Sequence, residues 1–190
     1  MSRYNALMSK IEVLYYPDPR LREVSSPVDD LDEIRGFLPA MFEIMYKSRG
    51  IGLAAPQVGI SKRFFVANIT GTPEEKDQER VFINPVITES SGDMKEIEGC
   101  LSLPGLEATI RRSEVVVVDI GDMEGKRQQV EVEGLYAKLF QHEIDHLDGI
   151  LMLDKMTPAE QKKWASFLKD LESDFEKNIR RNHTPTHAGL

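Results

Sequence analysis

The sequence predicts an α+β fold, in which antiparallel sheets pack around a central helix and an amphipathic helix lies at the C-terminal end. The central helix is expected around His142-Glu143-Ile144-Asp145-His146, where apolar residues recur at helical spacing on more than one side. Four runs of β-branched and alternating residues predict strands, two of them well before Cys100 and two after it, with turn residues between the runs. A helix with apolar residues on several sides is a buried one, so this helix belongs at the centre of the fold.

The predicted strands cover residues 64–69, 81–84, 114–120 and 128–133. Residues 121–125 form the expected loop between the last two strands, which makes antiparallel pairing the natural arrangement. A helix is expected after Asp30, with an apolar stripe that ends at Met45, and Pro39 should start or kink its second part. The charged residues 71–80 are expected to form a solvated loop.

The C-terminal helix is expected over residues 157–181, because Thr157 and Glu160 form a capping box with Pro158 at the first helical position. An apolar stripe on this helix should pack on the domain and consists of Trp164, Phe167, Leu168, Leu171, Phe175 and Ile179. Three basic residues give the end of the helix a positive cluster, namely Lys177, Arg180 and Arg181.

Length and composition predict one globular domain over residues 1–182, followed by a flexible tail over residues 183–190, since 41% of the 190 residues are hydrophobic. No apolar run of about 18 residues exists, and the first ten residues lack the apolar core of a secretory signal, so no membrane contact is expected. The single cysteine cannot form an internal disulfide, and a free thiol suits the cytoplasm. The net charge of −8 argues against a general affinity for nucleic acid, so no direct nucleic-acid specificity is expected.

The central motif predicts a metal site. His142 and His146 are four residues apart, so on a helix both imidazoles point from one face and can bind a single ion. Glu143 lies about 100° round the helix and can reach a water molecule bound to that ion. Two histidines leave a tetrahedral ion short of a third protein ligand.

The residues alone leave the third ligand open. The metzincin pattern fails, because Met152 stands where its third histidine would be. A downstream glutamate, as in thermolysin-like enzymes, would have to be Glu160, Glu172 or Glu176. Cys100 is the remaining soft ligand, although a lone cysteine is more often a small buried hydrophobe. The glycines and proline of residues 99–105 are expected to hold Cys100 in a constrained turn.

Residues 50–59 place three glycines and two alanines around Gln57. The segment is not a phosphate loop, because the Gly-Lys-Ser/Thr ending is absent. Small residues let a backbone come close to another strand or to a ligand. A tight connection from helix to strand is the equally weighted alternative.

Together these segments resemble the peptide deformylase family, which removes the formyl group from the initiator methionine of new polypeptides. The family motifs are Gly-φ-Gly-φ-Ala-Ala-x-Gln, Glu-Gly-Cys-φ-Ser and His-Glu-x-x-His, with φ apolar. They occur in this order at residues 50–57, 98–102 and 142–146, and the resemblance runs from about Ile11 to Leu153. It implies a metal-dependent hydrolase of the bacterial type that releases formate from N-formyl-methionyl nascent peptides.

The resemblance also implies roles for single residues. The implied ligands of one divalent ion are Cys100, His142 and His146. The family implies Fe²⁺ as the native ion, with Zn²⁺ or Ni²⁺ able to occupy the site. Glu143 would be the general base, and the Gln57 amide and Leu101 backbone N–H would bind the oxyanion. The residues implied in substrate binding are Gly50, Ile51, Gly52 and Leu139.

Two positions depart from the family pattern. Glu107 stands seven residues after the cysteine, where some bacterial members carry an Arg that helps hold the peptide, and Arg111 and Arg112 follow further on. Lys138 stands one turn before His142, where relatives often have an apolar residue lining the methionine pocket. The stem of this lysine can pack there while its amine reaches solvent.

Two other functions remain open from the residues. One is a different metallohydrolase, such as an aminopeptidase, with a downstream glutamate in place of Cys100. The other is a metal-binding or ribosome-associated protein without catalysis, against which Gln57 and Glu143 weigh, because neither is needed to hold a metal. In bacterial deformylases a C-terminal helix docks on the ribosome, and the basic helix end is similar in character, so contact with the ribosome is a further expectation.

Overall fold

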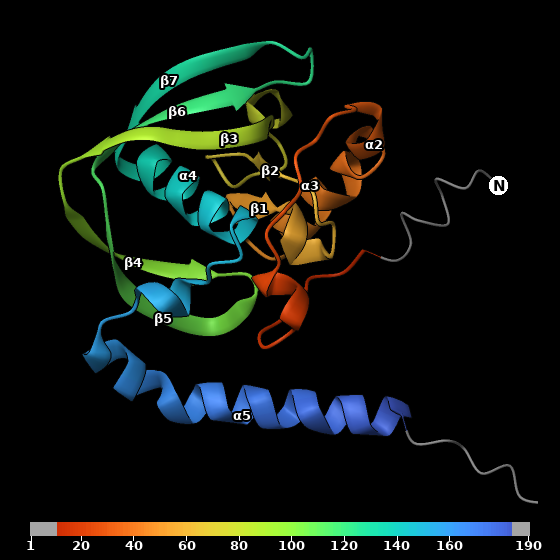
Figure 1. Cartoon of the computed structure of the whole chain (residues 1–190), viewed down its shortest axis with the longest axis vertical. Helices are drawn as coiled ribbons and strands as arrows, with labels where there is room; N and C mark the ends of the chain where they lie inside the picture. Colours follow the sequence, from red (N-terminus) through yellow and green to blue (C-terminus); the bar gives the residue numbers. More distant parts are fainter. Residues whose placement is uncertain (1–10, 184–190) are drawn as a thin grey trace, which may run out of the picture.

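The computed structural model describes residues 11–183, and their side chains as far as Lys177. The structure is layered (Figure 1), with helix α4 (Gly134–Leu147) between a five-stranded sheet and a two-stranded sheet. Helix α5 (Pro158–His183) lies outside the two-stranded sheet. The helix that carries the His-Glu-x-x-His motif is therefore enclosed between two sheets.

All neighbouring strands of the larger sheet are antiparallel, and they follow the order β1-β2-β3-β6-β7. The strands are β1 (Gly52–Ala54), β2 (Phe64–Ala67), β3 (Arg80–Ser91), β6 (Val115–Gly121) and β7 (Arg127–Glu133). The short strand β1 is an edge of this sheet. An edge strand keeps one row of backbone N–H and C=O groups outside the ladder, where another chain can pair with it.

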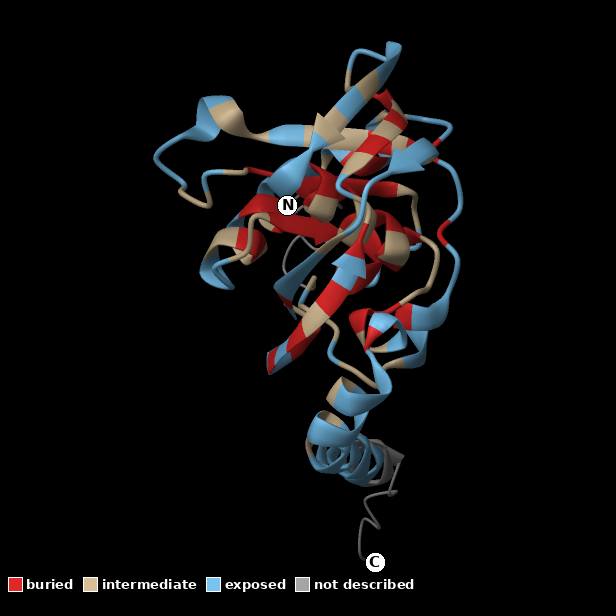
Figure 2. Ribbon diagram, turned by 90° about the vertical axis from the view of Figure 1, so that its left-hand side faces the viewer, coloured by how far each residue is buried: buried red, intermediate tan, exposed pale blue. Residues whose placement is uncertain are grey.

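Helix α4 packs on the larger sheet through the apolar residues that its 3.6-residue period brings to one side. This cluster contains Leu139, Phe140, Ile144 and Leu147 of α4 with Phe65, Val116 and Val118 of the sheet. In β6, Val116, Val118 and Ile120 alternate with less buried neighbours, as a strand with one covered face requires. Figure 2 shows these central segments in red and most of α5 in pale blue.

The smaller sheet consists of β4 (Met94–Cys100) and β5 (Leu103–Arg112), joined by a tight turn at Leu101 and Ser102. Its apolar side packs on the short helix η4 (Met152–Lys155) and on α5. The partly buried residues of α5 in this cluster are Trp164, Phe167, Leu168 and Leu171. No helix in the described part of the chain, α5 included, has the length and apolar character of a membrane span.

Of the remaining helices, α3 (Leu38–Lys47) and η2 (Ala55–Val58) pack on the β1 end of the larger sheet. The others are η1 (Pro19–Arg22), α2 (Asp32–Arg35) and η3 (Lys76–Gln78). Met41 and Met45 of α3 are fully buried against Leu53, Phe64 and Val66. This packing fixes the segment that leads from α3 through Gly50 into β1.

The structure confirms the α+β fold, the central motif helix and the separate C-terminal helix. The predicted strands are present with shifted ends, and β3 is much longer than residues 81–84. Pro39 lies in the first turn of α3, so it starts a second helix after the short α2. The stripe of α5 packs on the domain at its first half, while the side chain of Ile179 lies outside the described ones.

Three predictions need correction. Cys100 is not within a turn but is the last residue of β4, and both β4 and β5 were unexpected. Strand β1 was also unexpected, because its three residues are too few to show a period. Helix α5 continues to His183 instead of ending at residue 181, and residues 184–190 of the predicted tail lie outside the described residues.

Candidate metal centre

Three possible metal donors meet between α4 and the end of β4. One donor atom each from Cys100, His142 and His146 lies within 4.8 Å of the others. The Cys100 Sγ is 3.2 Å from the His146 Nε2, close to the roughly 3.5 Å between donors on a tetrahedral ion with bonds of about 2.1–2.3 Å. No other group of His, Cys, Asp and Glu donors among the described residues meets in this way.

Two buried polar atoms at this centre have no hydrogen-bond partner among the described residues. They are the Oε2 of Glu143 and the Nδ1 of His146, whose residues are 3% and 1% exposed. Buried polar atoms without partners are rare in folded proteins and indicate an additional group at the site. A water molecule beside a metal ion would supply the partner that the Glu143 carboxylate lacks, so these residues fit a divalent ion.

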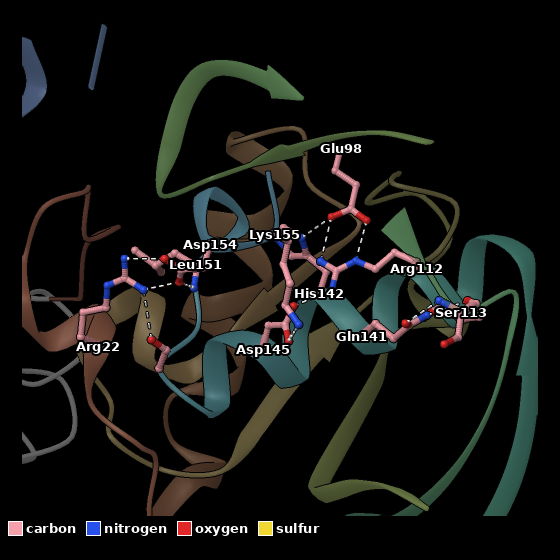
Figure 3. Close-up of polar contacts among 12 residues, drawn as sticks. Arg22, Glu98, Arg112, Ser113, Gln141, His142, Asp145, Leu151, Asp154 and Lys155 are labelled. Atoms are coloured by element: carbon pink, nitrogen blue, oxygen red, sulfur yellow. Dashed lines mark hydrogen bonds and ion pairs between the residues drawn. The ribbon is translucent and has the colours of Figure 1, made fainter. Parts of the chain in front are cut away.

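Glu98 fixes the orientation of His142 (Figure 3). The Nδ1 of His142 lies 3.0 Å from the Oε2 of Glu98. Arg112 donates to both oxygens of the same carboxylate, at 2.9 and 3.0 Å, and its third nitrogen contacts Asp145 of α4. A carboxylate that binds the Nδ1 of a metal-ligating histidine in this way sets the orientation of the ring, so that the Nε2 is the nitrogen that faces the ion. The sequence motif includes Glu98, but its contacts with His142 and Arg112 are visible only in the structure.

The electrostatic environment suits a thiolate ligand. Burial raises the pKa of the Cys100 thiol, but the neighbouring His146 and His142 outweigh this effect and lower the pKa to about 5. A thiolate, and not a thiol, is the form that binds metals. Burial raises the pKa of Glu143, whereas hydrogen bonds from His142 and Arg112 outweigh burial at Glu98 and lower its pKa to about 2.

Gln57 points its amide nitrogen into the same centre. Its Oε1 accepts a hydrogen bond from the backbone N–H of Ala54 at 2.9 Å, which fixes which end of the amide faces the site. The Nε2 lies 3.7 Å from the Cys100 Sγ and donates to the Ser102 hydroxyl at 3.2 Å. The side chain is only 1% exposed. Gln57 thus presents a fixed donor beside the three possible metal ligands.

A cleft of about 880 Å³ opens over this centre. The residues expected to bind the substrate all line it, namely Gly50, Ile51, Gly52 and Leu139, and so does Leu101, whose backbone N–H was expected to bind the oxyanion. A Cβ atom on Gly52 would lie 2.5 Å from the Leu139 side chain and 2.6 Å from the Glu143 Oε1. A Cβ on Gly50 would lie 3.0 Å from Leu101. These glycines therefore bring the backbone of the β1 edge close to the centre, as the small residues of this segment suggested.

The other candidate residues lie in different places. Glu160 forms an ion pair with Lys163, and Glu172 accepts a hydrogen bond from Tyr16, so neither is placed with the two histidines. Arg112 is buried against Glu98, and Arg111 pairs with Asp93. The Lys138 amine is not free in solvent but donates to Glu96 at 2.6 Å. Glu107 lines the cleft.

Comparison with known proteins agrees with this geometry. Residues 10–162 match the family model for polypeptide deformylase. A peptide deformylase of Neisseria meningitidis is 44% identical over 163 residues, which is 85% of this chain and 96% of that protein. One of Thermodesulfovibrio yellowstonii is 43% identical over 85% of this chain and 98% of that protein.

Solved structures give the same result. A peptide deformylase of Plasmodium falciparum superposes with a TM-score of 0.84 at 40% identity, over 94% of this chain and 100% of that one. A plant peptide deformylase, variant G41M of the Arabidopsis thaliana protein 1B, has a TM-score of 0.85 at 38% identity, over 88% and 92% of the two chains. The chain therefore belongs to the peptide deformylase family, whose members are metallohydrolases that remove the formyl group from the N-terminal methionine of nascent peptides.

Proposed function

We propose that this chain removes the formyl group by using Cys100, His142 and His146 as ligands of one divalent ion and Glu143 as the base. The observation that carries this proposal is the meeting of the three donor atoms within 4.8 Å beside the buried Glu143. When bound, a divalent ion lowers the pKa of water toward about 7 and polarises the formyl carbonyl. The remaining steps belong to the residues of the chain.

Glu143 moves the proton. Its carboxylate is buried and its Oε2 has no partner among the described residues, so it is available to accept a proton from the attacking water. As the bond between the formyl carbon and the nitrogen breaks, Glu143 delivers that proton to the departing amine. Formate and a free amino terminus are the products, and no redox partner is needed.

Gln57 and the backbone N–H of Leu101 bind the oxyanion that forms during the attack. The fixed orientation of the Gln57 amide supports this role, because the donor needs no reorganisation during the reaction. The peptide itself is held as an added strand on the free edge of β1 at Gly52, with Gly50, Ile51 and Leu139 beside it. In this mode, main-chain hydrogen bonds give affinity and side-chain pockets give specificity.

Fe²⁺ is the proposed native ion, as the family resemblance implies. Zn²⁺ and Ni²⁺ are alternatives, because one thiolate and two imidazoles suit all three ions. A reducing compartment suits a free thiolate ligand, so the cytoplasm is the proposed location. The test is formate release from formyl-Met-Ala-Ser by anaerobically purified protein, together with analysis of its metal content. Release of whole amino acids instead would favour an aminopeptidase, and metal without either activity would favour a binding protein.

The first prediction concerns Gln57. Its replacement by Ala should lower kcat for deformylation by about 10²–10³, because one preorganised oxyanion donor is removed. Metal content should not change, since the amide is no proposed ligand. Steady-state kinetics on formyl-Met-Ala-Ser make the measurement. A rise in KM at constant kcat would make Gln57 a residue that positions the substrate instead.

The second prediction concerns contact with the ribosome, which we propose for the basic end of α5. Lys177 is paired with Asp174 at 2.9 Å, and the side chains of Arg180 and Arg181 lie outside the described ones. Changing all three basic residues to Glu should leave activity on a short peptide nearly unchanged. Ribosome binding should weaken and its logarithmic salt slope should fall by up to about 3, because fewer counterions are released.

Co-sedimentation with ribosomes at two salt concentrations makes this measurement. A control with the same change of net charge replaces exposed basic residues far from the end of α5 with Glu, namely Arg35, Lys47 and Lys126. Equal binding of the wild type and the α5 variant at both salt concentrations would leave α5 as a packing element only.

A further inference from the structure

The cleft over the candidate metal centre extends as far as the first turns of α5. Trp164 of α5 and Glu107 of β5 line it together with Cys100 and Glu143. The indole Nε1 of Trp164 donates to the backbone oxygen of Glu107 at 3.0 Å, so α5 is attached to β5 at this point. The family match ends at residue 162, before Trp164. The outer end of the cleft therefore includes a residue beyond the matched region.

Most charged side chains that line this cleft outside the metal centre have an opposite charge beside them. The ion pairs are Lys138 with Glu96 at 2.6 Å, Lys163 with Glu160 at 3.4 Å, and Glu98 with Arg112 at 2.9 Å. Of the charged side chains that line the cleft, those of Arg49 and Glu107 form no ion pair or hydrogen bond with other residues that the structure describes. Arg49 precedes Gly50 on the β1 side of the cleft, whereas Glu107 lies on the β5 side.

Glu107 shares a face of the hairpin with an exposed apolar residue. In the hairpin, Glu107 is paired with Gly99 and Thr109 with Ile97, so Ile97 and Glu107 project from the same face. The neighbours Leu106 and Ala108 are buried on the opposite face. Ile97 is 65% exposed although it is a large apolar residue. An unpaired acid next to an exposed aliphatic side chain is complementary to the long stem and charged end of Lys or Arg.

We propose that Ile97, Glu107 and Trp164 form an outer subsite that binds a basic side chain of the substrate peptide. The proposal rests on the proposed deformylase function, because it assigns a preference among formyl-Met peptides. The aliphatic stem of the basic residue packs on Ile97, and its cation pairs with the Glu107 carboxylate. Trp164 forms the end wall and holds the backbone at Glu107 through its Nε1.

The distance to the metal centre limits which peptide position reaches this subsite. Glu107 lies directly across from Gly99, the residue before Cys100. Paired Cα atoms are about 4.5–5.5 Å apart and successive ones 3.8 Å, so the Cα atoms of Glu107 and Cys100 are within roughly 10 Å. An extended peptide advances about 3.3 Å per residue. The basic residue is therefore the second, third or fourth of the peptide.

The test measures kcat/KM for formate release by the metal-loaded enzyme. The substrates are formyl-Met-Ala-Ala-Ala peptides in which one of positions two to four is Lys, Gln or Glu. At one position the wild type should prefer Lys over Gln by about 3- to 10-fold, as expected of one partly screened ion pair with apolar packing. The preference should shrink at about 0.5 M salt.

The variants assign the preference to its residues. In Glu107→Gln the ratio of Lys to Gln peptides should fall to about 1, and Glu107→Arg should prefer the Glu peptide. Trp164→Phe, which lacks the indole donor, should lose part of the preference. Glu131→Gln on β7 is the matched control, because Glu131 is an exposed acid that does not line the cleft and should keep the wild-type ratio.

The outcomes separate this proposal from the function on which it rests. A wild type that releases formate from all peptides with equal kcat/KM would overturn the outer subsite and leave deformylation in place. A preference for Lys that survives in Glu107→Gln would overturn the role of Glu107. A wild type that releases no formate even from the neutral peptide would overturn the proposed function itself.

Discussion

Replacing Glu143 with Gln should lower deformylation by roughly 10²–10⁴ or more while the protein keeps its metal. Glu143 is proposed as the base, and its neighbours His142 and His146 as the ligands, so the change removes proton transfer and no metal bond. The amide has the same shape as the carboxylate, so the backbone at Gly52 keeps its close approach to this side chain. Turnover of formyl-Met-Ala-Ser and metal content per chain are the two measurements.

A stability measurement distinguishes this effect from misfolding. The Glu143 carboxylate is 3% exposed and one of its oxygens has no partner, so burying its charge costs free energy in the metal-free protein. Glu143→Gln should therefore unfold at a temperature equal to or above that of the wild type. A surface variant such as Glu131→Gln serves as the control for activity. Near-normal turnover by Glu143→Gln would show that another group handles the proton.

The central helix could be predicted because its signal is local. The 3.6-residue period of α4 and the spacing of His142 and His146 are both contained within one short segment. The strand that carries Cys100 could not be predicted in the same way. Pro104 and Gly105 are typical of turns, and although both lie within the bounds of β5, neither has a partner on β4, because the register shifts between Gly99 and Cys100. Cys100 itself pairs with Leu103 at the end of β4, so the predicted turn around Cys100 was wrong.

The residues that support the centre depend on this missed hairpin. Glu98 and Cys100 are two residues apart, so a strand places both side chains on one face, toward α4. Arg112 reaches Glu98 only because β5 folds back along β4, and the sequence gives no register for that pairing. A buried Arg and Glu also contradict the usual exposure of charged residues. Their pairing could be learned only from the structure.

The sequence predicted that the backbone at Gly52 comes close to another group, but it did not identify that group. The small residues around Gln57 indicated that the backbone comes near something, but not what that neighbour is. The structure identifies it as Leu139 and Glu143 on α4, which lie more than 80 residues further along the chain. The pairing of Lys138 with Glu96 was equally hidden, because it joins α4 to β4, which are distant in the sequence.

Replacing Cys100 with Ser should remove most of the affinity for a soft divalent ion, and with it nearly all deformylation. Cys100 supplies the only sulfur among the three donors, and its low pKa makes it an anionic ligand. A serine hydroxyl stays protonated at neutral pH and is a poor ligand. The alternative is that Cys100 only packs with Leu103 and Leu106, in which case the nearly isosteric change has a modest cost.

Two measurements distinguish a ligand from a packing residue. After dialysis, the wild type should retain about one ion per chain and Cys100→Ser much less. Added Zn²⁺ should raise the unfolding temperature of the wild type, because an ion that binds only the folded state stabilises it by mass action, whereas Cys100→Ser should respond weakly. This second measurement needs no catalysis, so it tests the ligand even if Glu143 or Gln57 has a different role. Full metal retention and intact activity in Cys100→Ser would exclude the sulfur as a ligand, and the downstream glutamates would then have to be tested in turn.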